Sequence, residues 1–294
     1  MLNVFLMFVL IMLATFQSLL CRQYSDRYPG EESMASPVFT IVSGLVVIVV
    51  SLVLCKFQFE ASLPTVILGV INSLVLYAYN YFIIKASVKG PYSILIVFSL
   101  SGAIVIPVLV DVLFFNGNLS AISIICILVV LFSVYLVSLK EDEEKTIKKG
   151  FWFACAGLCL SNGIYGSFIA SQQQISGVAE KEEMVAITYL GAVVLSVLTL
   201  AFRAKKKFFT HFRQTKSSCF YLITSAIVIA AALHLLTFMI DLIDLAILYT
   251  FDSSSVIVVS VLISWLFFKE KLSWKNIVGC VTMCAALISM SLFG

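Results

Sequence analysis

One acidic residue stands inside a long apolar stretch near the C-terminal end of the chain. Asp252 follows Tyr249 by three residues, directly precedes Ser253, and lies in the apolar run 243–268. On a helix, these spacings bring the three side chains to one face. A charged residue at the centre of a bilayer-spanning helix costs about 2.5–3.5 kcal/mol on insertion scales, and marks a functional site by default. We expect Asp252 to bind a cation or a proton. The alternative is a carboxylate that neighbouring serines cap, holding one helix against others.

A second set of candidates combines aromatic, hydroxyl and amide groups in the run 62–84. Tyr77, Asn80 and Tyr81 fall within an arc of about 100° on a helix, and Asn72 shares another face with Tyr79. Aromatic walls of this kind suit small polar metabolites or organic cations, the latter through cation–π attraction of about 0.5–2 kcal/mol each. The alternative is hydrogen bonding between helices, with tyrosines at the membrane interface.

Three further polar residues join these candidates. Asn162 and Tyr165 stand early in the run 150–171, and Gln17 stands in the run 2–20. We expect ten residues to line a substrate cavity: Gln17, Asn72, Tyr77, Asn80, Tyr81, Asn162, Tyr165, His234, Tyr249 and Asp252. Ser101 and Gly102 in the run 91–113 instead predict close helix packing.

His234 is surrounded by alanine and leucine in the run 218–240. Such a histidine either lines a cavity or packs as a core residue, and together with Asp252 it would form a proton relay. The eight cysteines mostly lie in apolar runs without histidine or acidic partners. Cysteine is a normal buried residue, so we expect neither a metal site nor a cofactor. Residues 172–174 and 180–183 are interpreted as an exposed loop.

These residues are positioned by elements whose solvent must be lipid. The chain of 294 residues is 61% apolar and 12% charged, whereas soluble domains are nearer 25% charged. This composition predicts an all-α polytopic membrane protein with the lipid bilayer as its partner. A net charge of +3 is too small to indicate a nucleic-acid partner. Ten apolar runs are visible: 2–20, 36–55, 62–84, 91–113, 119–139, 150–171, 184–203, 218–240, 243–268 and 273–293.

A duplication organises the ten runs. Residues 94–139 align with 247–292 without gaps, and sixteen of the forty-six positions are identical. A charged linker, 140–149, separates an N-terminal repeat, 1–139, from a C-terminal repeat, 150–294. Because each repeat holds five spans, the second enters the membrane upside down relative to the first. We therefore expect ten transmembrane helices arranged as two inverted five-helix repeats.

The basic residues predict the orientation. Seventeen of the nineteen Lys and Arg residues fall in the odd-numbered loops, and only Lys56 and Lys181 fall in even-numbered ones. Positive loops favour the cytoplasmic side. We expect odd-numbered loops to be cytoplasmic, both termini to lie outside, and the protein to reside in the cell's inner (plasma) membrane.

At this point the pattern resembles a known family. Five plus five inverted helices, with the stretch from Phe267 to Trp274 (Phe-Phe-Lys-Glu-Lys-Leu-Ser-Trp) leading into the last helix through Gly279, resemble the EamA-like members of the drug/metabolite transporter superfamily. Asn118 in the first repeat departs from the glutamate usual there. The resemblance implies a carrier that works by alternating access, with a central cavity between the halves. Members carry amino acids, quaternary amines, nucleotide sugars and other metabolites.

The sequence therefore predicts a secondary transporter of a small polar or amphipathic metabolite, such as an amino acid or organic cation, with possible proton coupling. No Gly-Lys-Ser/Thr phosphate loop is present, so ATP drive is not encoded. One alternative is an intramembrane enzyme acting on lipid, but two histidines and few membrane acids make a poor catalytic inventory. The other is a scaffold subunit that transports nothing.

Overall fold

Nine helices make up almost all of the computed structural model wherever it describes the chain. The described residues are 2–114, 121–138, 147–204, 210–212, 214–240, 242–243, 248, 252–253, 255–256, 259, 262–263, 265–266 and 273–293. No strand occurs among them. The helices are α1 (Leu2–Arg27), α2 (Glu32–Leu54), α3 (Leu63–Ser87), α4 (Tyr92–Phe114), α5 (Ala121–Ser138), α6 (Phe151–Ser176), α7 (Lys181–Ala204), α8 (Lys216–Ile240) and α10 (Trp274–Phe293).

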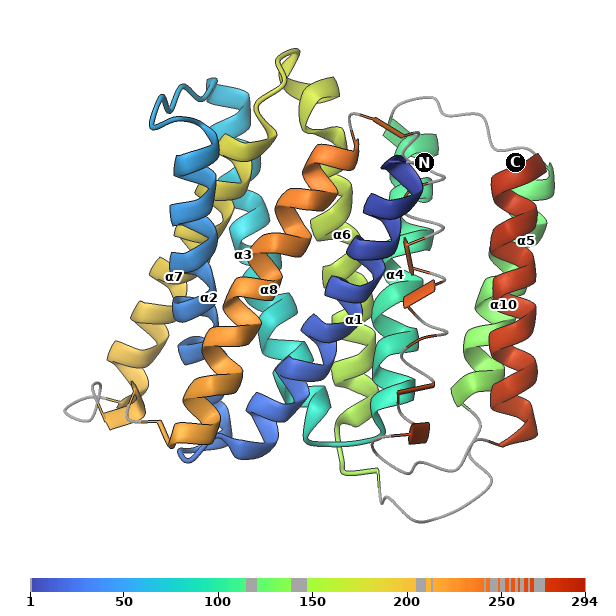
Figure 1. Cartoon of the computed structure of the whole chain (residues 1–294), viewed down its shortest axis with the longest axis horizontal. Coiled ribbons are helices and arrows are strands. Elements are labelled where there is room, and N and C mark those ends of the chain that lie inside the picture. The colour runs from blue at the N-terminus through green and yellow to red at the C-terminus, as the bar shows by residue number, and fades with distance from the viewer. Residues whose placement is uncertain are drawn as a thin grey trace.

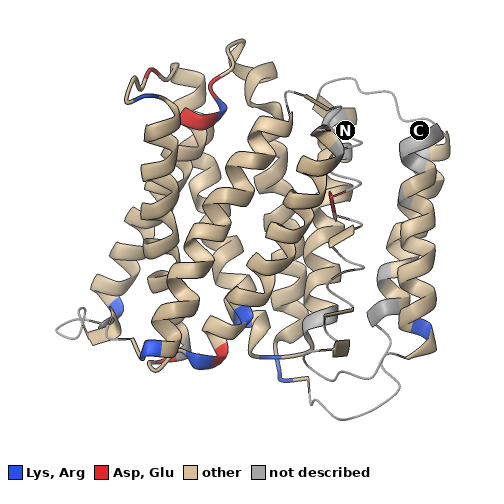
Figure 2. Ribbon diagram, in the orientation of Figure 1, with Lys and Arg blue, Asp and Glu red and all other residues tan. Residues whose placement is uncertain are grey.

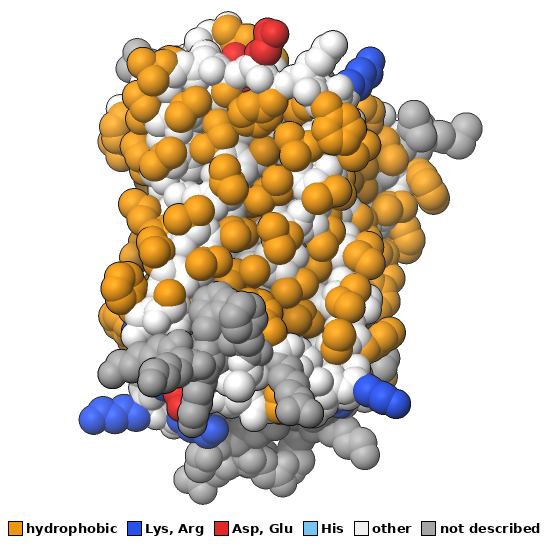
Figure 3. All heavy atoms as spheres, turned by 90° about the vertical axis from the view of Figure 1, so that its left-hand side faces the viewer, with side chains coloured by type: hydrophobic (Ala, Val, Ile, Leu, Met, Phe, Trp, Pro, Cys, Tyr) orange, Lys and Arg blue, Asp and Glu red, His pale blue; other side chains and the backbone are white. Residues whose placement is uncertain are grey.

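Seven of the helices within the described ranges are long and apolar enough to cross a bilayer. Their spans are Phe5–Arg27, Ser33–Leu54, Leu63–Ser87, Ile94–Phe114, Phe151–Ser176, Lys181–Arg203 and Lys216–Ile240. Many large apolar side chains point outward along these spans, and Figure 3 shows them covering the face between two charged ends. Outward leucine, isoleucine and phenylalanine are costly in water but favourable in lipid. The molecule is therefore an integral membrane protein.

The all-helical prediction is confirmed for the described residues, with two differences in detail. The first helix continues to Arg27, beyond the expected end at residue 20. The expected ninth helix, 243–268, lies mostly outside the described residues, so the ten-helix inverted repeat stays a prediction.

Helices distant in sequence pack side by side. The extensive contacts join α4 with α6, α3 with α6 and α7, α2 with α7 and α8, and α1 with α8. One large buried cluster links these helices, with Tyr24, Phe39, Phe151 and Met184 among its fully buried side chains. Figure 1 shows α5 and α10 side by side at one edge of the bundle. A second buried cluster joins them to α4 through Val97 and Ile104. The helices α5 and α10 also pack on each other, and Ser133 and Thr282 share a hydrogen bond of 2.8 Å across this contact.

The two ends of the bundle differ in charge, as Figure 2 shows. We call one the acidic end, because Glu180, Glu182 and Glu183 lie at the start of α7 there. The N- and C-terminal labels lie toward this end in Figure 1. We call the other the basic end, since α1, α3 and α7 finish there with Arg27, Lys85 and Arg203 in their last turns.

Candidate functional site

A cavity of about 150 Å³ lies inside the helix bundle. Its walls come from α1, α3 and α4 of the first half of the chain and from α6, α7, α8 and residues 252–256 of the second half. An engineered cavity of about this volume in another protein accommodates benzene. The cavity is therefore large enough for a small organic molecule.

Four of the expected site residues line this cavity: Gln17, Asn162, Tyr165 and Asp252. Asn162 is held in place, since its Nδ2 donates to the Ser99 carbonyl oxygen at 2.9 Å and lies 3.1 Å from the Ser99 hydroxyl. Both donor hydrogens are thus turned toward α4. Its amide oxygen remains available as an acceptor on the α6 side of the cavity.

Asp252 is the acidic residue of the cavity wall. Its Oδ1 is buried and has no hydrogen-bond partner among the described residues. Burying a carboxylate oxygen without a partner is costly, so such a group favours a bound cation or proton. The neighbouring Ser253 is buried and also lines the cavity.

Three tyrosines supply aromatic surface. The rings of Tyr79 and Tyr165 are stacked, with centroids 6.4 Å apart and planes inclined by 12°. Tyr189 of α7 is buried and lines the same cavity. Together they join α3, α6 and α7 around one side of the cavity.

Five other expected residues do not line the cavity. Asn72 of α3 is fully buried, and neither of its side-chain polar atoms has a hydrogen-bond partner among the described residues. Tyr77 shares a 2.8 Å hydrogen bond with Thr199, and Tyr81 accepts one of 2.7 Å from Lys85. Asn80 is buried. Tyr249 lies outside the described residues.

His234 is the fifth expected residue that does not line the cavity. It lies beside Glu182 rather than beside Asp252, the acid with which a proton relay was expected. Its Nδ1 lies 2.6 Å from Glu182 Oε2, across the contact between α8 and α7. Thr237 donates to the other Glu182 oxygen at 2.7 Å. The imidazole is 8% exposed and Thr237 is 2% exposed. We call these three residues the Glu182 cluster.

A hydrogen-bond network at the acidic end corrects the interpretation of residues 172–174 and 180–183 as an exposed loop. Gln172 lies inside α6 and is fully buried. Its amide nitrogen donates to Thr65 at 3.0 Å and to the Val178 carbonyl at 3.0 Å, and its oxygen accepts from the Glu180 backbone at 3.1 Å. The interpretation was wrong for Gln172, whereas Gln173 and Gln174 are exposed, although on a helix rather than a loop. The contact of Gln172 with α3 could not be read from a polar sequence next to a turn.

Glu180 completes this network. Its Oε2 accepts from the Ser62 hydroxyl at 2.7 Å and from the Ser62 backbone N–H at 3.0 Å. Hydrogen bonds from the hydroxyls of Ser62 and Thr65, and then from the Ser62 backbone, lower the pKa of Glu180 below its ordinary value. The carboxylate thus occupies the N-terminal end of α3, where unpaired N–H groups favour negative charge.

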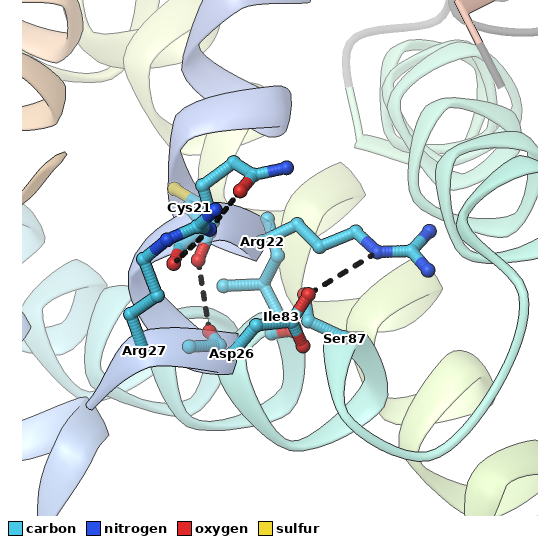
Figure 4. Close-up of polar contacts among 8 residues, drawn as sticks. Cys21, Arg22, Asp26, Arg27, Ile83 and Ser87 are labelled. Atoms are coloured by element: carbon cyan, nitrogen blue, oxygen red, sulfur yellow. Dashed lines mark hydrogen bonds and ion pairs between the residues drawn. The ribbon is translucent and has the colours of Figure 1, made fainter. Parts of the chain in front are cut away.

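The basic end carries a buried cation that sequence reasoning placed in a loop. Arg22 is 5% exposed, and its Nε lies 3.9 Å from a carboxylate oxygen of Asp26 one turn along α1. Figure 4 shows the guanidinium extending from α1 past Ser87 of α3. Tyr189 and Glu182 were likewise missed. For Tyr189, an aromatic hydroxyl inside an apolar run was the available signal.

Part of the chain is similar in sequence to a known family of membrane proteins. Residues 188–283 match the family model of the Small Multidrug Resistance proteins. That family consists of small transporters in the broader drug/metabolite transporter context. The match covers about a third of the chain, from α7 into α10, and favours membrane transport over enzymatic activity.

The fold has a counterpart among solved structures. One crystal structure of a protein aligns with a TM-score of 0.66 and 15% sequence identity, covering 99% of this chain and 97% of its own. At this identity the likeness concerns the fold alone. No curated protein sequence matches the chain.

Proposed function

We propose that the protein is a secondary transporter that moves a small organic cation, or a related polar metabolite with a cationic group, by alternating access. One observation carries the proposal: helices from both halves of the chain enclose a cavity that presents tyrosines and Asp252. A channel needs a continuous pore, whereas this cavity lies among packed helices. The similarity of residues 188–283 to Small Multidrug Resistance proteins supports transport independently.

The proposal includes two inverted five-helix repeats of the EamA-like kind. If the two repeats are related, each helix corresponds to the helix five places away in the chain. The contact between α3 and α6 then corresponds to the contact between α8 and α1, and the contact between α3 and α7 corresponds to that between α8 and α2. All four of these contacts are present. The pairs α2–α7 and α5–α10 map onto themselves and are also present. This pairing supports a pseudo-two-fold relationship whose axis passes by the cavity.

The cavity chemistry favours a cationic substrate. A tyrosine face attracts a cation by about 0.5–2 kcal/mol, and Asp252 supplies a formal negative charge when ionised. The other polar lining groups are neutral: Gln17, Ser18, Ser99, Asn162 and Ser253. A wholly anionic substrate would meet the acid without compensation from a cationic side chain among the described lining residues.

The proposed orientation puts the basic end in the cytoplasm of a cell with a plasma (inner) membrane. Arg27, Lys85, Arg203 and Lys216 mark that end among the described residues, and positive residues favour the cytoplasmic side. The acidic end and both termini then face outward.

Uptake into proteoliposomes tests the function. The purified protein is offered a panel of amino acids, primary and quaternary amines and neutral metabolites, with and without a pH gradient. We expect uptake of an organic cation by the parent and its loss, or loss of its pH response, in Asp252→Asn. Normal transport by this variant at every pH makes Asp252 structural. A parent that moves nothing, and whose melting no ligand shifts, favours the scaffold alternative.

A further inference from the structure

The Glu182 cluster lies away from the Asp252 cavity, at the acidic end of the bundle. Glu182 is in the first turn of α7, and His234 and Thr237 are in the last two turns of α8. None of the three lines the cavity. One carboxylate therefore ties together the ends of two neighbouring helices through both of its oxygens.

The imidazole of His234 has one nitrogen beside the Glu182 carboxylate, with Nδ1 2.6 Å from Oε2. Nδ1 and Nε2 are both buried, and neither makes a hydrogen bond of good geometry with a described residue. A neutral imidazole adds a proton at the ring nitrogen that lacks a hydrogen, and so becomes imidazolium.

From this geometry we infer that His234 and Glu182 form a proton-binding site at the acidic end, separate from the Asp252 cavity. Without the added proton, neutral imidazole beside carboxylate leaves a net charge of minus one in a largely buried place. Binding one proton to the imidazole gives an imidazolium–carboxylate pair with no net charge. A neutral pair is far less costly to bury than an unpaired charge, so protonation favours the closed contact between α7 and α8.

The ionisable groups near the His234–Glu182 pair leave that pair as the group whose charge changes with pH. α8 packs against α1, α2 and α7. Residues 2–20 of α1 hold no ionisable side chain, Cys55 and Lys56 follow α2, and α7 contributes Lys181 and Glu183. Glu183 Oε1 lies 3.7 Å from Cys55 Sγ. Burial, and then Glu183, raise the pKa of Cys55 to about 11, so this thiol stays protonated at neutral pH. Glu180 is engaged with Ser62, and Asp241 lies outside the described residues.

The site rests on the proposed function for its physiological role, which is to couple an external proton to closure of the outer end. Loss of the proton leaves the negative charge unbalanced and loosens α7 from α8. Proton binding itself needs no transport assay, so the two ideas fail separately.

The chain offers a direct test because it holds only two histidines, His211 and His234. In full-length His211→Asn protein, ring-labelled histidine gives the NMR signal of His234 alone. We expect the signal to change reversibly with pH as the ring gains and loses a proton. In Glu182→Gln, which lacks the adjacent charge, the midpoint of that change should differ from that of the parent. The matched control Glu183→Gln moves it much less.

A signal that does not change with pH overturns the inference, even if Glu182→Gln does not fold. An unchanged midpoint in folded Glu182→Gln overturns it as well. In proteoliposomes, His234→Gln should lose the stimulation by an inward proton gradient while substrate exchange persists. Retention of the full stimulation contradicts the coupling role. If the parent transports nothing, the proposed function fails, while the titration still decides the proton site.

Discussion

Gly102 of α4 and Gly163 of α6 lie directly against each other where the two helices cross. A Cβ at Gly163 would collide with the Gly102 carbonyl oxygen, and a Cβ at Gly102 would collide with the backbone of Cys159. Both glycines are buried. The close crossing holds the two helices that carry Ser99 and Asn162, and so fixes one wall of the cavity. Small residues allow such approach between membrane helices.

Gly102→Ala should therefore destabilise the protein strongly. The added methyl meets backbone atoms, which cannot rotate away, so the helices must separate. We expect a loss at or above the upper end of the usual overpacking range of about 1–3 kcal/mol, measured as a lower thermal unfolding midpoint in detergent. Gly44→Ala is the matched control, because Gly44 is also buried and the close contact of its added methyl is with a terminal methyl group of Val193, which can rotate away. Equal melting of both variants contradicts the crossing.

The sequence predicted close helix packing at Ser101 and Gly102 but not the partner Gly163, and it predicted most helices from their apolar runs. It did not predict the end of α1 at Arg27, since Arg22 was read as loop although α3 buries it. A charged residue at the edge of an apolar run can end a helix or be covered by another one, and only the packing decides.

The cavity was only partly predictable for a related reason. Tyr79 of α3 lines it, whereas Tyr77, Asn80 and Tyr81 do not. In a membrane helix the lipid-facing and core-facing sides are both apolar, so the sequence does not reveal which face turns inward. Asp252 was easier to identify because an acidic side chain in an apolar run is costly to expose to lipid and therefore faces the protein interior. The His234 partner was missed because Glu182 is 52 positions away in the chain.

Gln172→Ala tests the network at the acidic end. The change leaves the buried Thr65 hydroxyl and the Val178 carbonyl without the amide that donates to them. Thr65 keeps its hydrogen bond with Ser62, and the Val178 carbonyl keeps that with Ser176. The loss is therefore that of the amide's own hydrogen bonds, at about 0.5–1.5 kcal/mol each, and we expect a destabilisation of about 1–3 kcal/mol by thermal unfolding. Gln173→Ala is the control, because Gln173 is exposed on the same helix. If both variants melt like the parent, the network contributes nothing.

The acid sensitivity of the protein should depend in part on Glu180. Its pKa is lowered in the folded state, so its stabilising effect is present above the ordinary value of 4.5 and is lost as pH falls through the folded pKa. We expect the melting temperature to decrease as the pH is lowered below that value. Glu180→Gln, which keeps an acceptor but cannot titrate, should show a shallower decrease. Parallel pH profiles for parent and variant would exclude this contribution.

Tyr165→Ala tests the aromatic part of the proposed cation site. Removing one ring should weaken the apparent affinity for an organic cation about 2- to 30-fold, corresponding to about 0.5–2 kcal/mol. Competition against a labelled substrate measures the change. Tyr135→Ala on the exposed surface of α5 serves as the control. A neutral substrate that loses as much affinity as a cationic one would argue against cation–π attraction.

Exchange across proteoliposome membranes tests the central claim most directly. Vesicles containing the parent protein are loaded with an unlabelled organic cation, and entry of the same labelled compound is followed without any imposed gradient of protons. A carrier with one cavity between two halves predicts that internal substrate accelerates labelled entry, and that Asp252→Asn abolishes the acceleration. Labelled entry that is equally fast into empty vesicles, or is undiminished in Asp252→Asn, would contradict an alternating-access site at Asp252.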